Sequence, residues 1–522
     1  MRHAIRLRLA PVVACLLAAP AAQASDFMDT RLTFTMGDDD VLHQTGQAQP
    51  LSPNFNLGDR SQYRLFFDNL NSRFSGRENV SHLVMYKKMP GYVEHLDTEA
   101  SLVLRVDLSA LSANTNNVNS AFYDAGSYIR LVYHTQSAPE RAREGVSLTL
   151  FPLDTDRFRL GYLYDLSWGG TNASINQSIF PRLQGSSPGA KLQIDGERFY
   201  VFGGFKAASI VQPEQAIAPG TSDVETVRLA QTNYGLLGGA GVDPLDNLRV
   251  EAGTGYFQQG KFDLDTVVGK RIYTYGFSGR VVVHDKMPVP QSVDFLLYRN
   301  DPNAPMNLFQ RDKYAAGTLA WAVSAEATQL EQNLKDFDHS GATRLQAARA
   351  GAVQGNVKYG FLRASVTGIY RDVPFILRNQ PGYIPFQTIP YDAKVTAERF
   401  FAGSLDYYFE KLHLLPAIGG GVQLPATFGS DSVALFTSRT VVIRQQGSYS
   451  ILPPGASAKP ILQARASLRW DISDLMSAVA WVQLVHDPNG TYLELNPDGT
   501  SSERQFISSN FLGFGTSMQA RF

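Results

Sequence analysis

Pairs of aspartates separated by one residue are the spacing in this sequence with the clearest chemical meaning. Four such pairs occur: Asp38 and Asp40, Asp154 and Asp156, Asp263 and Asp265, and Asp336 and Asp338. Two carboxylates at a loop tip offer the oxygen ligands that Ca²⁺ binds. Aspartate is also frequent in turns, because its side chain hydrogen-bonds the nearby backbone. We favour the turn interpretation and predict no metal site.

The residues that hydrolytic or phosphate chemistry needs do not occur at useful spacing. A His-x-Ser pair is absent, and His339 and Ser340 are adjacent, so in a strand they would point to opposite faces. None of the nine histidines stands in a His-Glu-x-x-His motif. The glycine runs at 238–241 and 419–421 lack the Lys-Ser/Thr of a phosphate loop, and they favour strand bending or close backbone approach. We therefore predict that the protein is not an enzyme and has no cofactor.

The composition indicates which elements position these residues. Charged residues make up 18% of the 522 positions and aromatic residues 11%, and 44 glycines stand against 27 prolines. This balance is poor for helices and favourable for twisted strands, so we expect an all-β protein. The chain has 47 basic and 48 acidic residues, and this lack of a basic excess argues against a nucleic-acid partner.

The first 24 residues have the pattern of a cleavable signal peptide. Arg2, Arg6 and Arg8 form a basic start, residues 9–19 are apolar, and Ala22-Gln23-Ala24 is a small-x-small cleavage site. We predict cleavage before Ser25 and a mature domain of residues 25–522. Residues 12–15 also resemble a lipoprotein box, but little apolar sequence precedes Cys15. The single cysteine would be lost with the leader, so we expect no disulfide.

Alternation of apolar and polar residues recurs along the mature chain. Phe158, Leu160, Tyr162, Tyr164, Leu166 and Trp168 form one apolar row, and similar rows occupy 102–108, 146–150 and 462–470. A period of two is typical of strands. In a soluble sandwich these rows would face a second sheet, whereas in a transmembrane barrel they would face lipid. Trp168 and Trp470 would then be anchors at the membrane interface.

The connections between these strands fall into two length classes. Short turns are expected at 154–156, 196–197, 242–247, 410–413 and 472–476. Long loops rich in Gly, Pro, Ser and Asn are expected at 38–61, 169–188, 207–225, 372–393, 425–458 and 487–509. The alternation weakens near 331–357, which predicts either a small insert with a short helix or an additional strand.

The last segment, residues 511–522, alternates and ends on an aromatic residue, Phe522. It resembles the C-terminal strand of Gram-negative outer-membrane β-barrel proteins, although Ala520 stands where that pattern often has an aromatic residue. The resemblance implies a transmembrane antiparallel β-barrel of about 18 strands (range 16–20), with short periplasmic turns and long extracellular loops. It also implies that Phe522 is read by the barrel-assembly machinery and that outer-membrane lipid surrounds the chain.

The resemblance and the charges together predict a porin-like channel for small solutes. In such a barrel the charged residues of the strands would line an aqueous lumen. The candidate lumen-lining residues are Arg105, Asp107, Arg130, Arg159, Asp165, Arg249, Glu251, Arg465, Arg469 and Asp471. If these charges instead pair across the lumen, the barrel would be plugged.

A second hypothesis is a structural or binding role. The barrel would then be the outer-membrane component of a trans-envelope machine, such as one for polysaccharide export or gliding motility, with other envelope proteins as partners. The long loops at 38–61 and 425–458 and the irregularity near 343 motivate this hypothesis, although long external loops are common in barrels.

Overall fold

The structure is a computed structural model in which nearly all regular elements are β-strands. It describes residues 29–38, 80–89, 93–107, 122–124, 126–135, 144–155, 158–163, 166–169, 187–217, 224–262, 266–287, 289, 317–377, 387–433, 438–445, 448–473, 475–495 and 502–521. Within these ranges, no helix has both the length and the apolar character needed to span a membrane.

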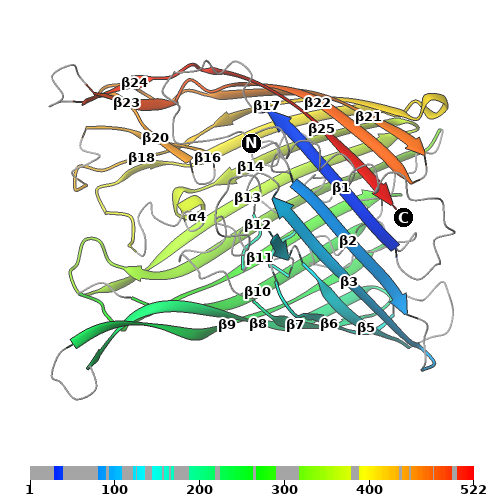
Figure 1. Ribbon diagram of the computed structural model, residues 1–522, viewed down its shortest axis with the longest axis horizontal. Helices are drawn as coiled ribbons and strands as arrows, with labels where there is room; N and C mark the ends of the chain where they lie inside the picture. The colour runs from blue at the N-terminus through cyan, green and yellow to red at the C-terminus, as the bar shows by residue number, and fades with distance from the viewer. Residues whose placement is uncertain are drawn as a thin grey trace, which may run out of the picture.

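One large antiparallel sheet contains most of the described strands (Figure 1). Its members are β1 (Asp29–Asp38), β2 (Val80–Met89), β3 (Leu96–Asp107), β4 (Phe122–Asp124), β5 (Tyr128–His134), β6 (Gly145–Phe151), β7 (Gly189–Asp195), β8 (Phe199–Ile217), β9 (Val224–Leu245), β10 (Leu248–Lys261), β11 (Arg271–Asp285), β12 (Leu319–Lys335), β13 (Thr343–Tyr359), β14 (Leu362–Arg371), β16 (Glu398–Tyr407), β17 (Leu414–Leu424), β21 (Ile461–Ser473), β22 (Met476–His486) and β25 (Asn510–Arg521).

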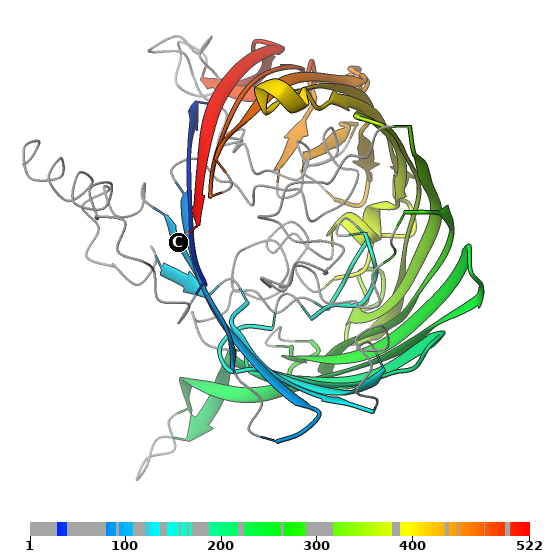
Figure 2. The same cartoon turned by 90° about the vertical axis from the view of Figure 1, so that its right-hand side faces the viewer.

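The first and last strands of this sheet are neighbours. β1 pairs with β2 along one edge and with β25 along the other, with Arg31 opposite Arg521 and Phe34 opposite Met518. In the end-on view the dark blue β1 lies beside the red β25, and the strands form a ring (Figure 2). The described sheet has 19 strands. The three-residue β4 pairs with the same edge of β3 as β5 does, so the two together count as one strand of the ring. The predicted antiparallel barrel of about 18 strands is confirmed.

Alternating exposure along the strands identifies the outer face of the barrel. Phe277, Val366 and Ile418 are 62%, 63% and 60% exposed, whereas their inner-face neighbours on the same strands are more enclosed. Large apolar residues on an outer face need an apolar surrounding, and in a barrel this is lipid. The rows predicted at 146–150 and 462–470 lie on this face, as does Trp470, which is half exposed near the end of β21.

The connections on one rim are mostly short, whereas those on the other vary, because 218–223, 262–270 and 336–342 are short and the rest are long. We call one the short-turn rim, because seven of its connections are at most ten residues long: 90–95, 135–144, 196–198, 246–247, 360–361, 408–413 and 474–475. The turn at 408–413 contains the 3-10 helix η4 (Glu410–Leu412). The connection of residues 286–318 belongs to the same rim and is long. The opposite, long-loop rim contains the predicted loops at 169–188, 372–393, 425–458 and 487–509.

Two predictions about these connections are wrong. The segment 331–357 is not an insert, because β12 and β13 pair continuously from Leu319 opposite Tyr359 to Lys335 opposite Thr343. The alternative of an additional strand is therefore confirmed. The loop expected at 207–225 is mostly strand, since β8 and β9 stay paired as far as Ile217 opposite Val224. This part of the hairpin extends beyond Lys206 and Gly235, the last residues that pair with β7 and β10.

Smaller elements cover the long-loop rim. The helix α4 (Val373–Leu377) follows β14, and a four-stranded sheet contains β15 (Lys394–Thr396), β18 (Ala426–Gly429), β19 (Val441–Gln445) and β20 (Ser448–Ile451). Val373 and Ile376 pack against Ala426 and Ile443, so the helix and this sheet share an apolar cluster. A separate hairpin joins β23 (Thr491–Leu495) to β24 (Ser502–Phe506).

Candidate functional site in the barrel lumen

The described residues between 152 and 169 (152–155, 158–163 and 166–169), which we call the inserted segment, lie inside the barrel instead of in its wall. β6 pairs directly with β7, from Phe151 opposite Gly189 to Gly145 opposite Asp195, so the residues between them are left out of the sheet. The predicted membrane strand at 158–168 and the short turn at 154–156 are therefore wrong. Leu160 and Trp168 instead pair in a local antiparallel bridge. Gly161, which directly follows Leu160, has a positive φ of 98°, and this allows the chain to turn there.

The apolar row of this segment forms a buried apolar cluster against the inner wall. Phe158, Leu160, Leu166 and Trp168 are each at most 1% exposed. The ring of Phe158 stacks on Phe151 with centroids 5.9 Å apart. The segment shares one cluster with residues from β5, β8, β9, β12, β13, β14, α4 and β16: Tyr128, Tyr200, Phe202, Leu237, Leu330, Ala348, Ala350, Ala352, Ile369, Phe375 and Phe400. Because this buried cluster consists of inner-face residues of the wall, the segment lies inside the ring. Trp168 is thus not an interface anchor.

Glycines in the wall make room for this row. A Cβ atom on Gly204 of β8 would lie 2.4 Å from Cε1 of Phe158, and one on Gly255 of β10 would lie 2.7 Å from Cδ1 of Leu160. Both distances are shorter than side chains tolerate. The glycines therefore allow the segment to approach the backbone of the wall closely.

Polar side chains from three strands fix the segment to the wall. The carboxylate of Glu326 on β12 accepts hydrogen bonds from the backbone N–H groups of Tyr162 (2.8 Å) and Leu163 (2.7 Å). The indole N–H of Trp168 donates to Oγ of Ser278 on β11 at 3.0 Å. Nζ of Lys206 on β8 donates to the carbonyl oxygens of Thr155 (2.8 Å) and Gly169 (2.7 Å), and so holds both ends of the segment.

A buried charge cluster lies beside these anchors. The phenol of Tyr200 donates to Oε1 of Glu251 at 2.9 Å, and Nη1 of Arg280 lies 3.7 Å from Oε2 of the same carboxylate. The guanidinium of Arg280 also lies over the ring of Tyr162, 5.6 Å from its centroid. Burial and the nearby Glu251 carboxylate raise the pKa of the Tyr162 phenol, so that group stays protonated and neutral. Through Arg280, the segment therefore interacts with the charged groups of the wall.

Two further charge ladders run across the inner face of neighbouring strands. On β2, β3 and β5, Glu99 accepts from Tyr86 (2.7 Å) and pairs with Arg130 (3.5 Å). On β14 and β16, Arg371 pairs with Glu398 at 3.0 Å and Arg363 with Asp406 at 2.7 Å. These pairs place fixed charges on the inner face, and within each pair the two opposite charges interact at short range.

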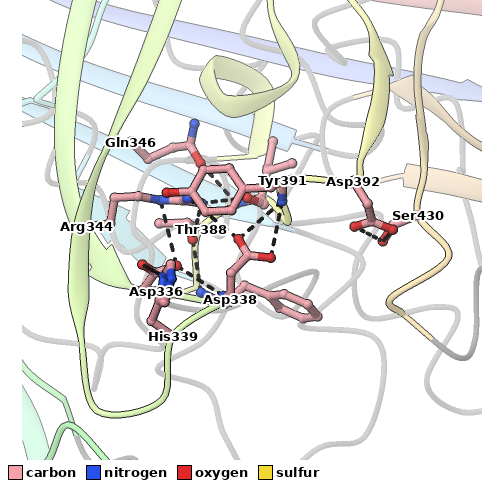
Figure 3. Close-up of polar contacts among 11 residues, drawn as sticks. Asp336, Asp338, His339, Arg344, Gln346, Thr388, Tyr391, Asp392 and Ser430 are labelled. Atoms are coloured by element: carbon pink, nitrogen blue, oxygen red, sulfur yellow. Dashed lines mark hydrogen bonds and ion pairs between the residues drawn. The ribbon is translucent and has the colours of Figure 1, made fainter.

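At the long-loop rim, a polar cluster ties the 387–393 segment to the β12–β13 hairpin (Figure 3). Nη2 of Arg344 donates to Oγ1 of Thr388 and to the carbonyl of Ile389, both at 2.8 Å, and its guanidinium lies 3.9 Å from the ring centroid of Tyr391. Asp336 accepts from His339 at 2.9 Å. The predicted turn role of the Asp336 and Asp338 pair is confirmed, because Asp336 accepts the backbone N–H of Asp338.

Most of the predicted lumen-lining residues lie on the inner face of described strands. These are Arg130, Arg249, Glu251, Arg465, Arg469 and Asp471, each on the strand face opposite the exposed apolar row. Several pair with neighbours: Arg249 with Asp243, and Arg469 with Asp471 at 2.8 Å. Their role in solute passage stays a prediction.

The other predicted residues have different outcomes. Arg159 is buried within the inserted segment, where its Nη2 donates to the carbonyl of Ser167 at 3.2 Å, so it does not line the wall. Arg105 and Asp107 belong to β3, opposite His82 and Val80, but the structure does not describe their side chains. Asp165 and Phe522 lie outside the described residues, as does the leader.

Sequence reasoning missed Glu326, Arg280 and Lys206, which position the inserted segment. Each lies on a strand of the barrel, and the period-two pattern places Glu326 and Lys206 on the face opposite their apolar neighbours. Nothing in the pattern distinguished these three residues, because the groups that they contact in the inserted segment are 37 to 164 residues away in the chain. Among the described residues, no group of three or more His, Cys, Asp or Glu is arranged to hold a metal ion.

The general class of the fold follows from the ring of strands and its apolar outer face. The chain is a large antiparallel β-barrel of the outer-membrane class. No family model matches it, and no curated protein matches it.

Solved structures that resemble the chain are bacterial outer-membrane proteins. OccK8 (OprE) of Pseudomonas aeruginosa has a TM-score of 0.43 at 8% identity, covering 95% of this chain and 98% of that one. OmpT of Vibrio cholerae has a TM-score of 0.34 at 8% identity, covering 97% and 100%. Wzi of Escherichia coli, described as a carbohydrate-binding β-barrel involved in group 1 capsule assembly, has a TM-score of 0.39 at 11% identity, covering 98% and 87%. No functional inference follows from likenesses at this level.

Proposed function

We propose that this protein is an outer-membrane channel for small solutes whose lumen is narrowed by the inserted segment. The observation that carries the proposal is the attachment of residues 158–169 to the inner wall through Glu326, Ser278 and Lys206. A barrel of about 18 strands is wide enough for water if nothing fills it. A segment fixed to one side of such a lumen narrows the path and sets its local charge.

The outer face supports a membrane location for this channel. Apolar residues such as Leu236, Phe277 and Val366 are 57–63% exposed on three different strands, which is stable only against lipid. The inner face, in contrast, has the charge ladders described above. Fixed charges in a lumen bias which ions pass.

The test is planar-bilayer recording of the purified protein, with Glu326→Ala as the informative variant. Removing this carboxylate abolishes two hydrogen bonds to a charged acceptor, each worth about 1.5–3 kcal/mol. We expect the inserted segment to leave the wall part of the time. Single-channel conductance should then rise at least twofold, with increased current noise.

The matched control is Glu331→Ala, on the same strand but on the opposite face, where Glu331 contacts Gln329. It should conduct like the wild type. If the wild-type protein shows no discrete openings in any orientation or voltage, the channel proposal is wrong. If Glu326→Ala and wild type have the same conductance, the inserted segment does not limit the path.

A further inference from the structure

The inner face of β21 and β22 presents a compact group of side chains outside the region of the inserted segment. Gln463 and Arg465 lie on β21, and Trp481 and Gln483 lie on β22. Arg465 is directly opposite Gln483 in the register, and its guanidinium lies 5.0 Å from the ring centroid of Trp481. All four residues point inward, because Leu462, Leu468, Val482 and Leu484 occupy the exposed face of the same strands.

Glycines flank this group on both sides. On β17, Gly421 is opposite Gln463 and Gly419 is opposite Arg465. On β25, Gly513 is opposite Gln483 and Gly515 is opposite Trp481. The inward positions next to the group therefore carry no side chains. The strip of polar and aromatic side chains is therefore flanked by glycine backbone on both sides.

The two glutamines have unmet hydrogen-bonding capacity. Gln463 and Gln483 are 6% and 3% exposed, and the Oε1 atom of each is buried without a hydrogen-bond partner. Buried polar atoms in native proteins nearly always have a partner, and leaving one without it costs about 1–3 kcal/mol. Two such acceptors in one strip therefore need a donor that no described side chain supplies, either water or a hydroxyl group of a ligand.

We propose that this strip is a binding subsite for a saccharide. The ligand must donate to two amide oxygens, which excludes inorganic phosphate and simple carboxylates because these groups only accept. It must also tolerate the guanidinium of Arg465, which excludes a cation. Sugar hydroxyl groups both donate and accept, and the apolar face of a sugar ring suits a strip containing an indole. The proposal rests on the channel function, because it assigns the solute class of the same lumen.

The test compares maltotriose with inorganic phosphate as probes, in planar bilayers and by tryptophan fluorescence of the detergent-solubilised protein. Maltotriose should block the current in a saturable way at millimolar concentrations, and phosphate at the same concentration should block it far less. Replacing both acceptors, in Gln463→Leu/Gln483→Leu, should raise the half-blocking maltotriose concentration at least fivefold. The control Gln332→Leu removes a similarly buried inner-face glutamine on β12 and should leave that concentration at the wild-type value.

The outcomes separate the subsite from the channel. Openings without any maltotriose block, or equal block in wild type and double variant, would overturn the subsite and leave the channel standing. A protein that shows no openings but whose fluorescence saturates with maltotriose, more weakly in the double variant, keeps the subsite and loses the channel. Stronger block by phosphate would overturn the assignment of the solute class. The comparison of the two probes on the wild type needs no variant, so it decides the proposal even if the double variant fails to fold.

Discussion

Single carboxylates organise the loops of this barrel by accepting several hydrogen bonds at once. Asp392 shows this at the long-loop rim (Figure 3), where Oδ2 accepts the backbone N–H groups of Asp431 (2.8 Å) and Ser432 (2.9 Å) and the hydroxyl of Ser430 lies 3.0 Å from Oδ1. One side chain thereby holds the residues that follow β18 against the connection before β15. The backbone N–H of Ser432, together with Ser430 and Asp431, lowers the pKa of Asp392 below its ordinary value of 3.8.

This lowered pKa predicts an acid-sensitive loop contact. A carboxyl group whose pKa is lower in the folded state stabilises the contact above its unfolded value and loses that effect as the pH falls through the folded value. Hydrogen exchange of residues 430–433 should therefore show protection at pH 5 that is lost near pH 3, after correction for intrinsic exchange. Asp392→Asn should lack the protection at both values, whereas Asp431→Asn should behave like wild type. Equal protection at pH 5 in Asp392→Asn would contradict this role.

At the level of elements, the inserted segment is stabilised by packing more than by its own backbone bonds. Trp168 illustrates this, because its ring lies 5.4 Å from that of Phe257 on β10 and its indole N–H reaches Ser278 on β11. The segment has one local bridge, between Leu160 and Trp168. Its position is therefore decided by the wall that it contacts.

The two tryptophans Trp168 and Trp470 offer a matched test of whether the inserted segment is buried inside the barrel. Trp168→Ala removes a side chain that is 1% exposed and should cost about 3–5 kcal/mol of unfolding free energy. Trp470→Ala removes a half-exposed side chain on the outer face and should cost far less in detergent. Urea titration of the detergent-solubilised protein measures both. Equal losses would contradict the burial of the inserted segment inside the barrel.

At the level of the whole molecule, closure of the ring depends on the pairing of the two ends of the chain. β25 is hydrogen-bonded to β22 on one side and to β1 on the other. Without it, both neighbours would expose unpaired backbone groups, each of which costs several kcal/mol in lipid.

Deleting residues 510–522 should therefore prevent formation of the barrel. We expect the deletion variant to lose the heat-modifiable, compact form on gels and to be degraded or aggregated in cells. Phe522→Ala, which keeps the β25 pairings, separates assembly from stability: it should lower the yield of assembled barrel in cells but refold normally in detergent. A deletion variant that still migrates as a compact form would show that the ring closes without β25.

The sequence by itself determined the class of fold. A period of two, repeated in many short segments with turn residues between them, is a local property, and it placed the rows at 146–150, 462–470 and 511–522 on strands with the correct faces. The pattern also sorted Arg249, Glu251, Arg465 and Asp471 onto the face opposite the apolar residues.

Only the tertiary structure decided which apolar rows face lipid and which face the lumen. The row from Phe158 to Trp168 has the same alternation as a membrane strand, yet β6 and β7 pair without it and leave it inside the ring. Alternation defines two faces but not what covers each of them. Glu326 meets Tyr162 only because closing the ring brings β12 and the inserted segment together, 164 residues apart in the chain.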